Sequence, residues 1–438
     1  MARTKKAELE IERLLWRAGF GPRPGDVKRL ARKGRQAAVE ELLRPRGARW
    51  AGPEAKVDGA PLDPLNVYGH DVLWWFDKCV RTRQPLAERM ALNWHDHFAT
   101  SNQKVGDVQL MVKHYYTLRT HALGNFRKLA LAMLNDGAMQ LWLDLAGSDK
   151  NSPNENFARE LMELFTLGVN NGYTEKDIRE AARALTGYTF DYDTKSFGYD
   201  ADRHDTDFKR IFGKRGRFTA IDVVNMAVEH PNHPKYLCSK LWSYFTPRPV
   251  PPATLRQMIR AYKASKYEIK PVLRIILNHP TLYADLDAPD QVKPPVVFAA
   301  GILRRLNRGI TYGDWTYQLD EMGQQPFYPP NVAGWDQDAS WLSPATIRAR
   351  FDVVSKVLDK DIKDGSIDKT ETVDQALASA IAATGRPQIS PRTRTAMKRY
   401  AAAAVAGRTD DWEVKHYFPE RQRVLRHLLL AGPDAQVC

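Results

Sequence analysis

Apolar residues recur at intervals of three and four along almost the whole chain, and this pattern is typical of amphipathic helices. The opening segment shows it with Ile11, Leu14 and Leu15, and the pair Gly21-Pro22 marks its end. The sequence therefore predicts a mainly α fold, in which many helices pack into a globular domain.

Two segments depart from the helical pattern. Aromatic residues alternate between Tyr188 and Tyr199 on both sides of a polar turn, which predicts one small β-hairpin near 188–200. The segment 323–335 contains three prolines, so it can be neither a helix nor a central strand. Because this segment is also apolar and aromatic, we expect a long Pro-rich loop that is ordered and packs across the helices.

A polar stretch at 359–369, rich in Asp and Lys, interrupts the helices late in the chain. The residues after it are rich in Ala and Arg. We therefore expect a main helical domain over 1–358 and a peripheral helical subdomain over 359–438.

Composition narrows the functional classes. The formal charge is 65 − 52 = +13, without a zinc-finger, RNP-type or helix-turn-helix signature, so a nucleic-acid partner is not expected. The three cysteines have no CxxC spacing, which argues against a disulfide scaffold and a cysteine-built zinc site. No apolar run is long enough for a membrane span and no export signal is visible, so we expect a cytoplasmic protein.

The densest polar motif within an apolar segment lies at 152–168. A helix here would place Glu155, Arg159 and Glu163 on one face, four residues apart, with Arg183 available on the following helix. One interpretation is a partly buried ion network that fixes how the two helices meet. The other uses Glu155, at the start of its helix beside Asn154, as a base or a ligand.

A second cluster contains His95 and His97. In a continuous helix their rings lie ~200° apart and cannot share a metal ion. If the helix ends near Trp94, an extended His-x-His would place both rings on one side and suit a divalent first-row metal. Histidines that cap a helix or pack in the core are the simpler interpretation.

The pair His204-Asp205 follows the predicted hairpin and could act as an acid–base site, although an Asp-rich surface turn explains it equally well. Trp94 and Trp335 lie in polar motifs and could wall a sugar-binding cleft, or could simply be core residues. No nucleophile elbow, P-loop or dinucleotide fingerprint is present.

Several long motifs follow one another in a fixed order, and together they resemble a known family. They are Leu14-Leu-Trp-Arg-Ala-Gly-Phe-Gly-Pro22, Trp94-His-Asp-His-Phe-Ala-Thr-Ser101, Ala122-Leu-Gly-Asn-Phe-Arg127, the segment 153–168, the segment 173–187, His204-Asp205, Lys293-Pro-Pro-Val296, Gly323-Gln-Gln-Pro-Phe327 and Pro329-Pro-Asn-Val-Ala-Gly-Trp335. The series resembles the bacterial family catalogued as domain of unknown function 1800, over about residues 8–355.

The resemblance implies no chemistry, because the function of that family is unassigned. It implies a bacterial protein whose relatives are often exported and often encoded beside a sulfatase- or phosphatase-like partner protein. This chain differs from that pattern because it shows no export signal.

From these observations we expect an enzyme of hydrolase or lyase type that acts on a polar substrate, with carbohydrates as the candidate substrate class. The expected catalytic residues are Glu155, Glu163, His204 and Asp205, and the expected substrate-binding residues are Asn154, Arg159, Arg183, Trp94, Trp335 and Asn331. One alternative is a non-catalytic scaffold or partner-binding protein with a basic face that includes Lys28, Arg29 and Arg32. Another is a metal-dependent enzyme that uses His95 and His97.

Overall fold

The computed structural model describes residues 2–47, 49–52, 54–191, 193–194, 196–359 and 370–438. The mainly α prediction is confirmed, and the strands of the described residues form only two-stranded hairpins. The first part of the chain contains α1 (Ala2–Arg17), α2 (Asp26–Lys33), α3 (Arg35–Leu43), β1 (Lys56–Val57), β2 (Ala60–Pro61), α4 (His70–Arg81), α5 (Pro85–His97), α6 (Asn102–Val105), α7 (Val108–His121), α8 (Phe126–Leu134) and α9 (Gly137–Trp142).

The middle of the chain contains the 3-10 turn η1 (Leu145–Gly147), α10 (Asn156–Glu160), the π-helical segment η2 (Leu161–Thr166), α11 (Glu175–Ala184), β3 (Tyr188–Asp191), β4 (Ser196–Tyr199), η3 (Ala201–Arg203), β5 (Lys209–Ile211), β6 (Lys214–Gly216), α12 (Ala220–Glu229), α13 (His233–Phe245), α14 (Pro252–Ala264) and α15 (Ile269–Asn278). The last part contains η4 (Pro280–Tyr283), α16 (Pro295–Arg305), α17 (Trp315–Glu321), η5 (Asp338–Leu342), α18 (Pro344–Leu358), α19 (Val373–Ala383), α20 (Pro391–Ala403), α21 (Asp411–Ala431) and α22 (Pro433–Gln436). None of the described helices is both long and apolar enough to cross a membrane.

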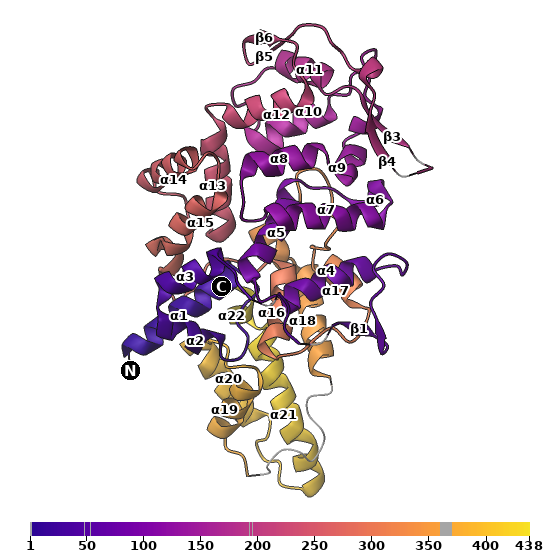
Figure 1. Cartoon of the computed structure of the whole chain (residues 1–438). Helices are drawn as coiled ribbons and strands as arrows, with labels where there is room; N and C mark the ends of the chain where they lie inside the picture. Colours follow the sequence, from indigo (N-terminus) through magenta and orange to yellow (C-terminus); the bar gives the residue numbers. More distant parts are fainter. Residues whose placement is uncertain (1, 48, 53, 192, 195, 360–369) are drawn as a thin grey trace.

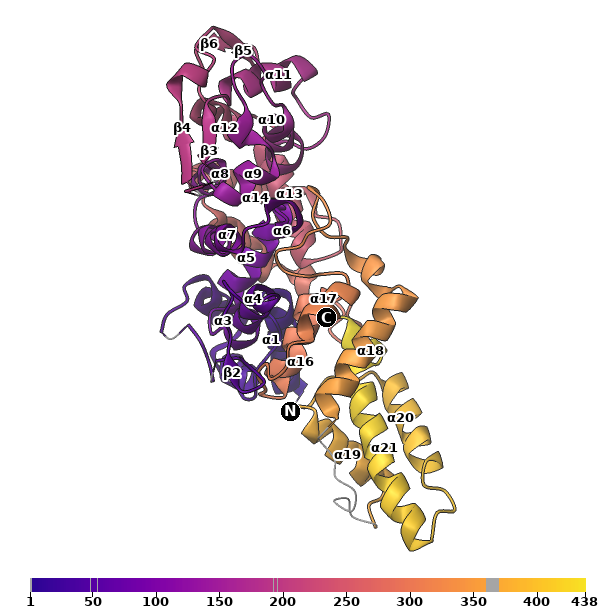
Figure 2. The same cartoon turned by 90° about the vertical axis from the view of Figure 1, so that its right-hand side faces the viewer.

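The molecule is elongated (Figures 1 and 2). Helices α10–α12 and the hairpins β3–β4 and β5–β6 lie at one end, and α19–α21 lie at the other. One large apolar core joins α1–α3 and α5 to the helices α8–α15. A second core is formed by α4, α16, α17 and α18 together with part of the Pro-rich loop.

The hairpin predicted near 188–200 is present, with Tyr188 opposite Tyr199 and Phe190 opposite Phe197. The expectation of a single hairpin was wrong, because β1–β2 and β5–β6 form two further hairpins. The β1–β2 loop is Asp58-Gly59, and both residues have positive φ, 51° and 82°. This is the backbone of a two-residue hairpin turn, for which Asp-Gly is a favoured pair.

The Pro-rich loop is ordered and packs across helix α5, as expected. The backbone N–H of Trp335 donates to the Asp96 carboxylate at 2.8 Å, and the backbone N–H of Phe327 donates to the His95 ring at 3.1 Å. Gly334 has φ +92°, and a Cβ there would lie 2.3 Å from Asp96 Oδ1. Only glycine allows this close approach of the loop to α5.

The C-terminal helices α19, α20 and α21 share a small apolar core of their own. The chain then returns to the main body, because Cys438 N donates to Gln291 O at 2.8 Å and Lys293 N donates to Gln436 O at 2.8 Å. Helix α21 also packs along α18. The C-terminal helices are therefore fastened to the main body by the segment that follows them as well as by the one that precedes them.

Gly301 offers a direct test of how α1 packs on α16. A Cβ at this position would lie 2.3 Å from the Trp16 ring, whereas a Cβ at Gly309 would meet nothing within 4 Å. Alanine normally stabilises a helix interior relative to glycine. Nevertheless, we expect Gly301→Ala to lower the free energy of unfolding by about 1–3 kcal/mol, because the Trp16 ring must move.

Urea unfolding of the two variants checks this expectation, with Gly309→Ala as the control that should change stability little. An equal or higher stability of Gly301→Ala would contradict the packing described for Trp16.

Candidate functional site

A chain of buried hydrogen bonds runs from the Pro-rich loop into the core. The backbone N–H of Phe327 can only donate, so the Nε2 atom of His95 accepts and the proton of this neutral ring sits on Nδ1. That proton points to Nε2 of His114 at 3.4 Å, and Nδ1 of His114 donates to Asp136 Oδ1 at 2.9 Å. Burial, followed by the charge of His114, lowers the pKa of His95 well below its ordinary value.

The ring of His97, the second predicted metal ligand, lies on a different side of helix α5 from the ring of His95. Helix α5 extends through His97, and Nε2 of this ring bonds the carbonyl of Phe165 at 3.0 Å. The rings of His95 and His97 are therefore on different sides of a continuous helix, and the extended arrangement required for a shared metal is not formed. Among the described residues, no three His, Cys, Asp or Glu side chains are grouped as a metal site.

Between these two histidines, Asp96 is a half-buried carboxylate to which the sequence analysis assigns no role. Its carboxylate accepts from the N–H of Trp335 at 2.8 Å and from the Gln337 amide at 2.9 Å. Burial raises the pKa of Asp96 to about 6, and the bond from Trp335 and the charge of Lys240 oppose that rise. Asp96 therefore holds the Pro-rich loop on α5, and it is the single carboxyl of the segment Trp94-His-Asp-His97, which we call the WHDH motif.

The predicted acidic cluster forms around Arg159. This guanidinium binds Glu155 at 3.0 Å, Glu163 at 3.3 Å and Glu175 of α11 at 2.8 and 3.0 Å. All four side chains are partly exposed, so the cluster is a solvated network that ties α10 to α11. The two predicted catalytic carboxylates, Glu155 and Glu163, are thus both paired with the same cation.

Glu160, in the same motif, has a different environment. It is half-buried, and the described part of the chain provides no hydrogen bond or ion pair to its carboxylate. Burial, and then the neighbouring charge of Glu163, raise its pKa. It lies at the junction of α10 with the π-helical segment η2, a kind of helix distortion that is frequent at functional sites.

Asp205 and His204 form a separate group near the hairpins. Arg183 holds Asp205 through two bonds, at 2.7 and 3.3 Å, and Lys209 lies 3.5 Å from the same carboxylate. Burial alone would raise the pKa of Asp205, but the bonds from Arg183, the backbone N–H of Asp207 and the charges of Lys209 and Arg183 together outweigh it, and the pKa is lowered. The ring of His204 donates from Nδ1 to the carbonyl of Thr186 at 3.0 Å.

Asp205 and His204 do not lie beside the Arg159 cluster. Glu175 and Arg183 are eight residues apart on helix α11, which corresponds to about 12 Å along the axis. Asp205 and His204 are therefore not placed as acid–base partners of Glu155 and Glu163.

The remaining predicted binding residues support the backbone or the core. Asn154 and Asn331 each accept from the backbone N–H two residues later, at 2.8 Å, and so stabilise turns. Trp94 is 1% exposed and donates to the carbonyl of Ala122, and Trp335 is 5% exposed and packs against the His95 ring. Neither indole has a free face for stacking on a sugar.

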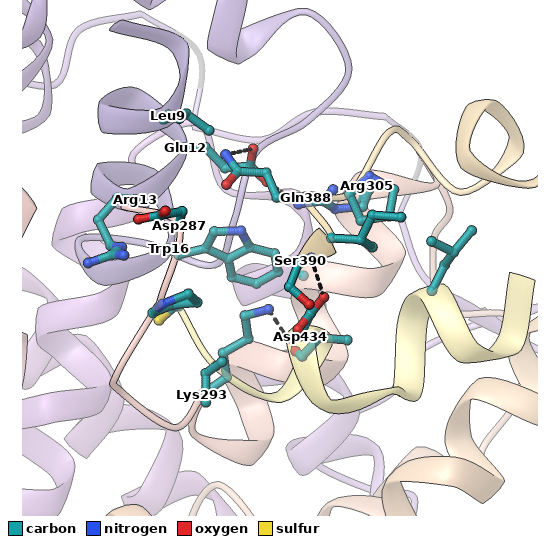
Figure 3. A pocket seen from close by; sticks show the side chains of 18 of the residues that line it. Leu9, Glu12, Arg13, Trp16, Asp287, Lys293, Arg305, Gln388, Ser390 and Asp434 are labelled. Atoms are coloured by element: carbon teal, nitrogen blue, oxygen red, sulfur yellow. Dashed lines mark hydrogen bonds and ion pairs between the residues drawn. The ribbon is translucent and has the colours of Figure 1, made fainter. Parts of the chain in front are cut away.

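A cavity of about 570 Å³ lies at a site that the sequence did not reveal, between α1, α16 and the C-terminal helices (Figure 3). Trp16 forms one wall, and the side chain of Lys293 reaches toward it with its ammonium 4.0 Å from the ring centre. Glu12 and Arg305 form an ion pair at 2.6 Å on another wall. We call this space the junction cavity.

The comparison with protein families agrees with the sequence motifs. The model of the family described as "Protein of unknown function (DUF1800)" matches residues 13–437, nearly the whole chain. The chain belongs to this family. No curated protein and no solved structure matches it.

Two of the family motifs meet at the junction cavity. Trp16 belongs to the motif at 14–22, and Lys293 opens the Lys-Pro-Pro-Val motif. The only sequence signal that could have pointed to this site is the presence of a lysine and a tryptophan in these two motifs, since no spacing links them.

The raised pKa of Asp96 predicts a pH dependence. Its pKa is higher in the folded state than the ordinary 3.8, so the stability it contributes is fully present below pH 3.8 and is lost as the pH rises through about 6. We expect the stability of the wild type relative to Asp96→Asn to fall by about 2 kcal/mol between pH 4 and pH 7.

Chemical denaturation of both proteins at several pH values provides this difference, in which the titrations of shared groups cancel. Asp205→Asn is the control. Since the pKa of Asp205 is lowered, wild type should not lose stability relative to that variant over the same range. A pH-independent difference for Asp96→Asn would refute the assignment.

Proposed function

We propose that this protein acts by binding an acidic partner protein, and that its polar motifs serve mainly to hold the fold together. What supports this proposal is the distribution of charge. The carboxylates predicted to be catalytic are held by Arg159 or Arg183, and both tryptophans of the predicted site are buried. By contrast, several cations near the N-terminus lack a counter-ion.

These cations define a basic surface made of Lys5, Lys28, Arg32 and Arg394. All four are exposed, and none has a carboxylate partner among the described residues. Lys28 and Arg32 of α2 line one hollow with Thr4, Ala7 and Glu8 of α1, so two cations face one carboxylate there. Lys5 and Arg394 line the junction cavity on the other side of α1. This concentration of unpaired positive charge around α1 is the observation that carries the proposal.

The basic surface differs from the face expected from sequence. Arg29 is not free, because it pairs with Glu41 at 2.7 Å and with Asp26 at 3.5 Å. Four cations are also few for a nucleic acid, whose binding commonly neutralises six to ten phosphates. An acidic protein surface fits better, and a sulfatase- or phosphatase-like protein is the first partner to test because the family resemblance suggests it.

Charge reversal tests the basic surface. We expect the quadruple variant Lys5→Glu, Lys28→Glu, Arg32→Glu, Arg394→Glu to bind fluorescent poly-L-glutamate, a model for an acidic protein segment, at least tenfold more weakly in low salt. Fluorescence anisotropy measures the affinity, and thermal unfolding checks that the variant is folded.

A control variant with the same change of net charge separates a local surface from total charge. Lys113, Lys150, Arg256 and Arg260 are exposed and unpaired within the described chain, and they lie on or beside other elements. Their reversal to Glu should weaken binding less than twofold. If both quadruple variants lose affinity equally, attraction depends on net charge alone and the proposed surface is wrong.

A second candidate is the acid–base enzyme, and Glu160 is the observation that favours it. As an unpaired, half-buried carboxyl with a raised pKa, it has the environment of a general acid. A panel of chromogenic glycosides and esters tests this role. Any turnover should fall at least 100-fold in Glu160→Gln and stay within twofold in Glu175→Gln, whereas equal effects would exclude Glu160 as the acid.

A further inference from the structure

The junction cavity has the size of a small-molecule site. Its volume of about 570 Å³ lies within the usual range for ligand pockets. Four separate parts of the chain enclose it: helix α1, residues 286–305, residues 387–394 and residues 429–438. None of the residues predicted from the sequence to be catalytic or substrate-binding lines it.

Lys293 is the polar centre of this cavity. It is 6% exposed, and its Nζ atom donates to the carbonyl of Ala435 at 2.7 Å while lying 4.0 Å from the centre of the Trp16 ring (Figure 3). No carboxylate among the described residues forms an ion pair with it. A lysine ammonium has three donors, and a single carbonyl and an aromatic face leave it without a direct ion pair, while the charges of Cys438 and Glu12 act on it from a greater distance.

Most of the other charged groups that line the cavity have partners. Arg305 pairs with Glu12, which also accepts from the Gln388 amide at 3.0 Å. Asp434 accepts from the backbone N–H of Ser390 at 2.6 Å, and Asp287 is an exposed carboxylate. Arg13 and Lys293 are the two buried cations of the described wall without a carboxylate ion pair. Arg13 donates three hydrogen bonds to backbone carbonyls, whereas Lys293 donates one, so Lys293 is the group with donors left for an incoming ligand.

The rest of the wall is largely apolar. Trp16 and Phe298 contribute aromatic rings, and Leu9, Ile302 and Leu430 contribute aliphatic side chains. Binding a hydrocarbon body against such a surface is favourable because it removes apolar area from water. A small hydrated ion brings no such stabilisation.

From these features we propose that the junction cavity binds an amphipathic organic anion, with a carboxylate paired to Lys293 and an apolar body packed against Trp16 and its aliphatic neighbours. The ligand would touch both α1 and the C-terminal segment. Its binding would therefore stabilise the attachment of the C-terminal helices to the main body.

This inference is independent of the basic surface proposed above. Lys5 and Arg394 lie at the rim of the cavity and belong to that surface, so neither is changed in the experiment below. Loss of poly-L-glutamate binding and loss of carboxylate binding can thus occur separately.

Decanoate is a suitable probe, with decan-1-ol as the uncharged compound of the same chain length and acetate as the anion without an apolar body. Isothermal titration calorimetry of the full chain at pH 6.5 should show decanoate binding at least tenfold more tightly than either. Lys293→Met retains most of the side-chain length and removes the charge. In this variant the affinity for decanoate should fall about tenfold or more, and the affinity for decan-1-ol should change less than twofold. Equal binding of decanoate and decan-1-ol by the wild type would overturn the proposal.

A second variant covers the case in which Lys293→Met does not fold. Leu9 lines the cavity from α1 and is only half-buried, so Leu9→Trp should fill the space without disturbing the core. We expect Leu9→Trp to abolish binding of both decanoate and decan-1-ol, whereas Lys113→Met, on α7 and outside the cavity, should leave both unchanged. Retained decanoate affinity in Leu9→Trp would place the ligand elsewhere and refute the inference.

The pH dependence gives a further readout. Burial lowers the pKa of Lys293 to about 7, and an anion binds only the protonated amine, so the affinity for decanoate should fall by up to tenfold per pH unit above pH 7. The decline should vanish in Lys293→Met, and a decline of the same slope in that variant would contradict the assignment. The charged groups around Lys293 on the surrounding elements are Lys5, Glu12 and Arg13 of α1, Asp287, Arg305 of α16, Arg350 of α18, Arg394 of α20, Asp434 of α22 and the terminal residue Cys438.

Discussion

The hydrogen bond from the backbone of Phe327 to His95 is the interaction on which the arrangement of the main body depends. It fixes the tautomer of His95, which in turn orients His114 and, through it, Asp136 at the start of α9. One chain of buried donors and acceptors thus joins four elements: the Pro-rich loop, α5, α7 and α9. Because every member is neutral or paired, the chain can lie in the core without the cost of an isolated charge.

This arrangement explains why the WHDH motif looks like a metal site in the sequence and is not built as one. Histidines at positions i and i+2 of a helix face different neighbours, so His95 serves the loop and His97 serves the segment around Phe165. Asp96, between them, receives the second anchor of the loop at Trp335. Through these three residues, one turn of α5 binds the Pro-rich loop at two points and the segment around Phe165 at a third.

Local features of the fold could be predicted from the sequence because their causes are local. The capping box of Thr174 and Asp177 starts α11, and Arg159 meets Glu155 and Glu163 because residues four apart share a helix face. The Asp58-Gly59 turn has an equally local cause, because Asp-Gly is a favoured pair for a two-residue hairpin turn. The partner of Arg159 on α11, Glu175, could not be identified, because the angle between two helices is a property of their packing.

The junction cavity could not be predicted either, because it depends on the packing of segments that are far apart in the sequence. Glu12 and Arg305 are 293 positions apart, and Lys293 meets Ala435 across 142 positions. No periodicity reports such distances. What the sequence does contain is a lysine followed by two prolines, and these prolines start α16 while Lys293 pairs with the returning C-terminal segment.

Two regions of the molecule differ in how completely their charged side chains are paired. Around α5, α10 and α11 almost every charged group of the family motifs has a partner in the fold, so these groups are already used for stability. Near the joint of α1 with α20 and α22, Lys293 inside and Lys5 and Arg394 at the rim have none. Lys5 and Arg394 are exposed and remain hydrated, whereas a buried cation without an ion pair, such as Lys293, costs free energy that a bound anion would offset. This difference is why the proposed ligand site lies at the joint rather than at the histidine and glutamate motifs.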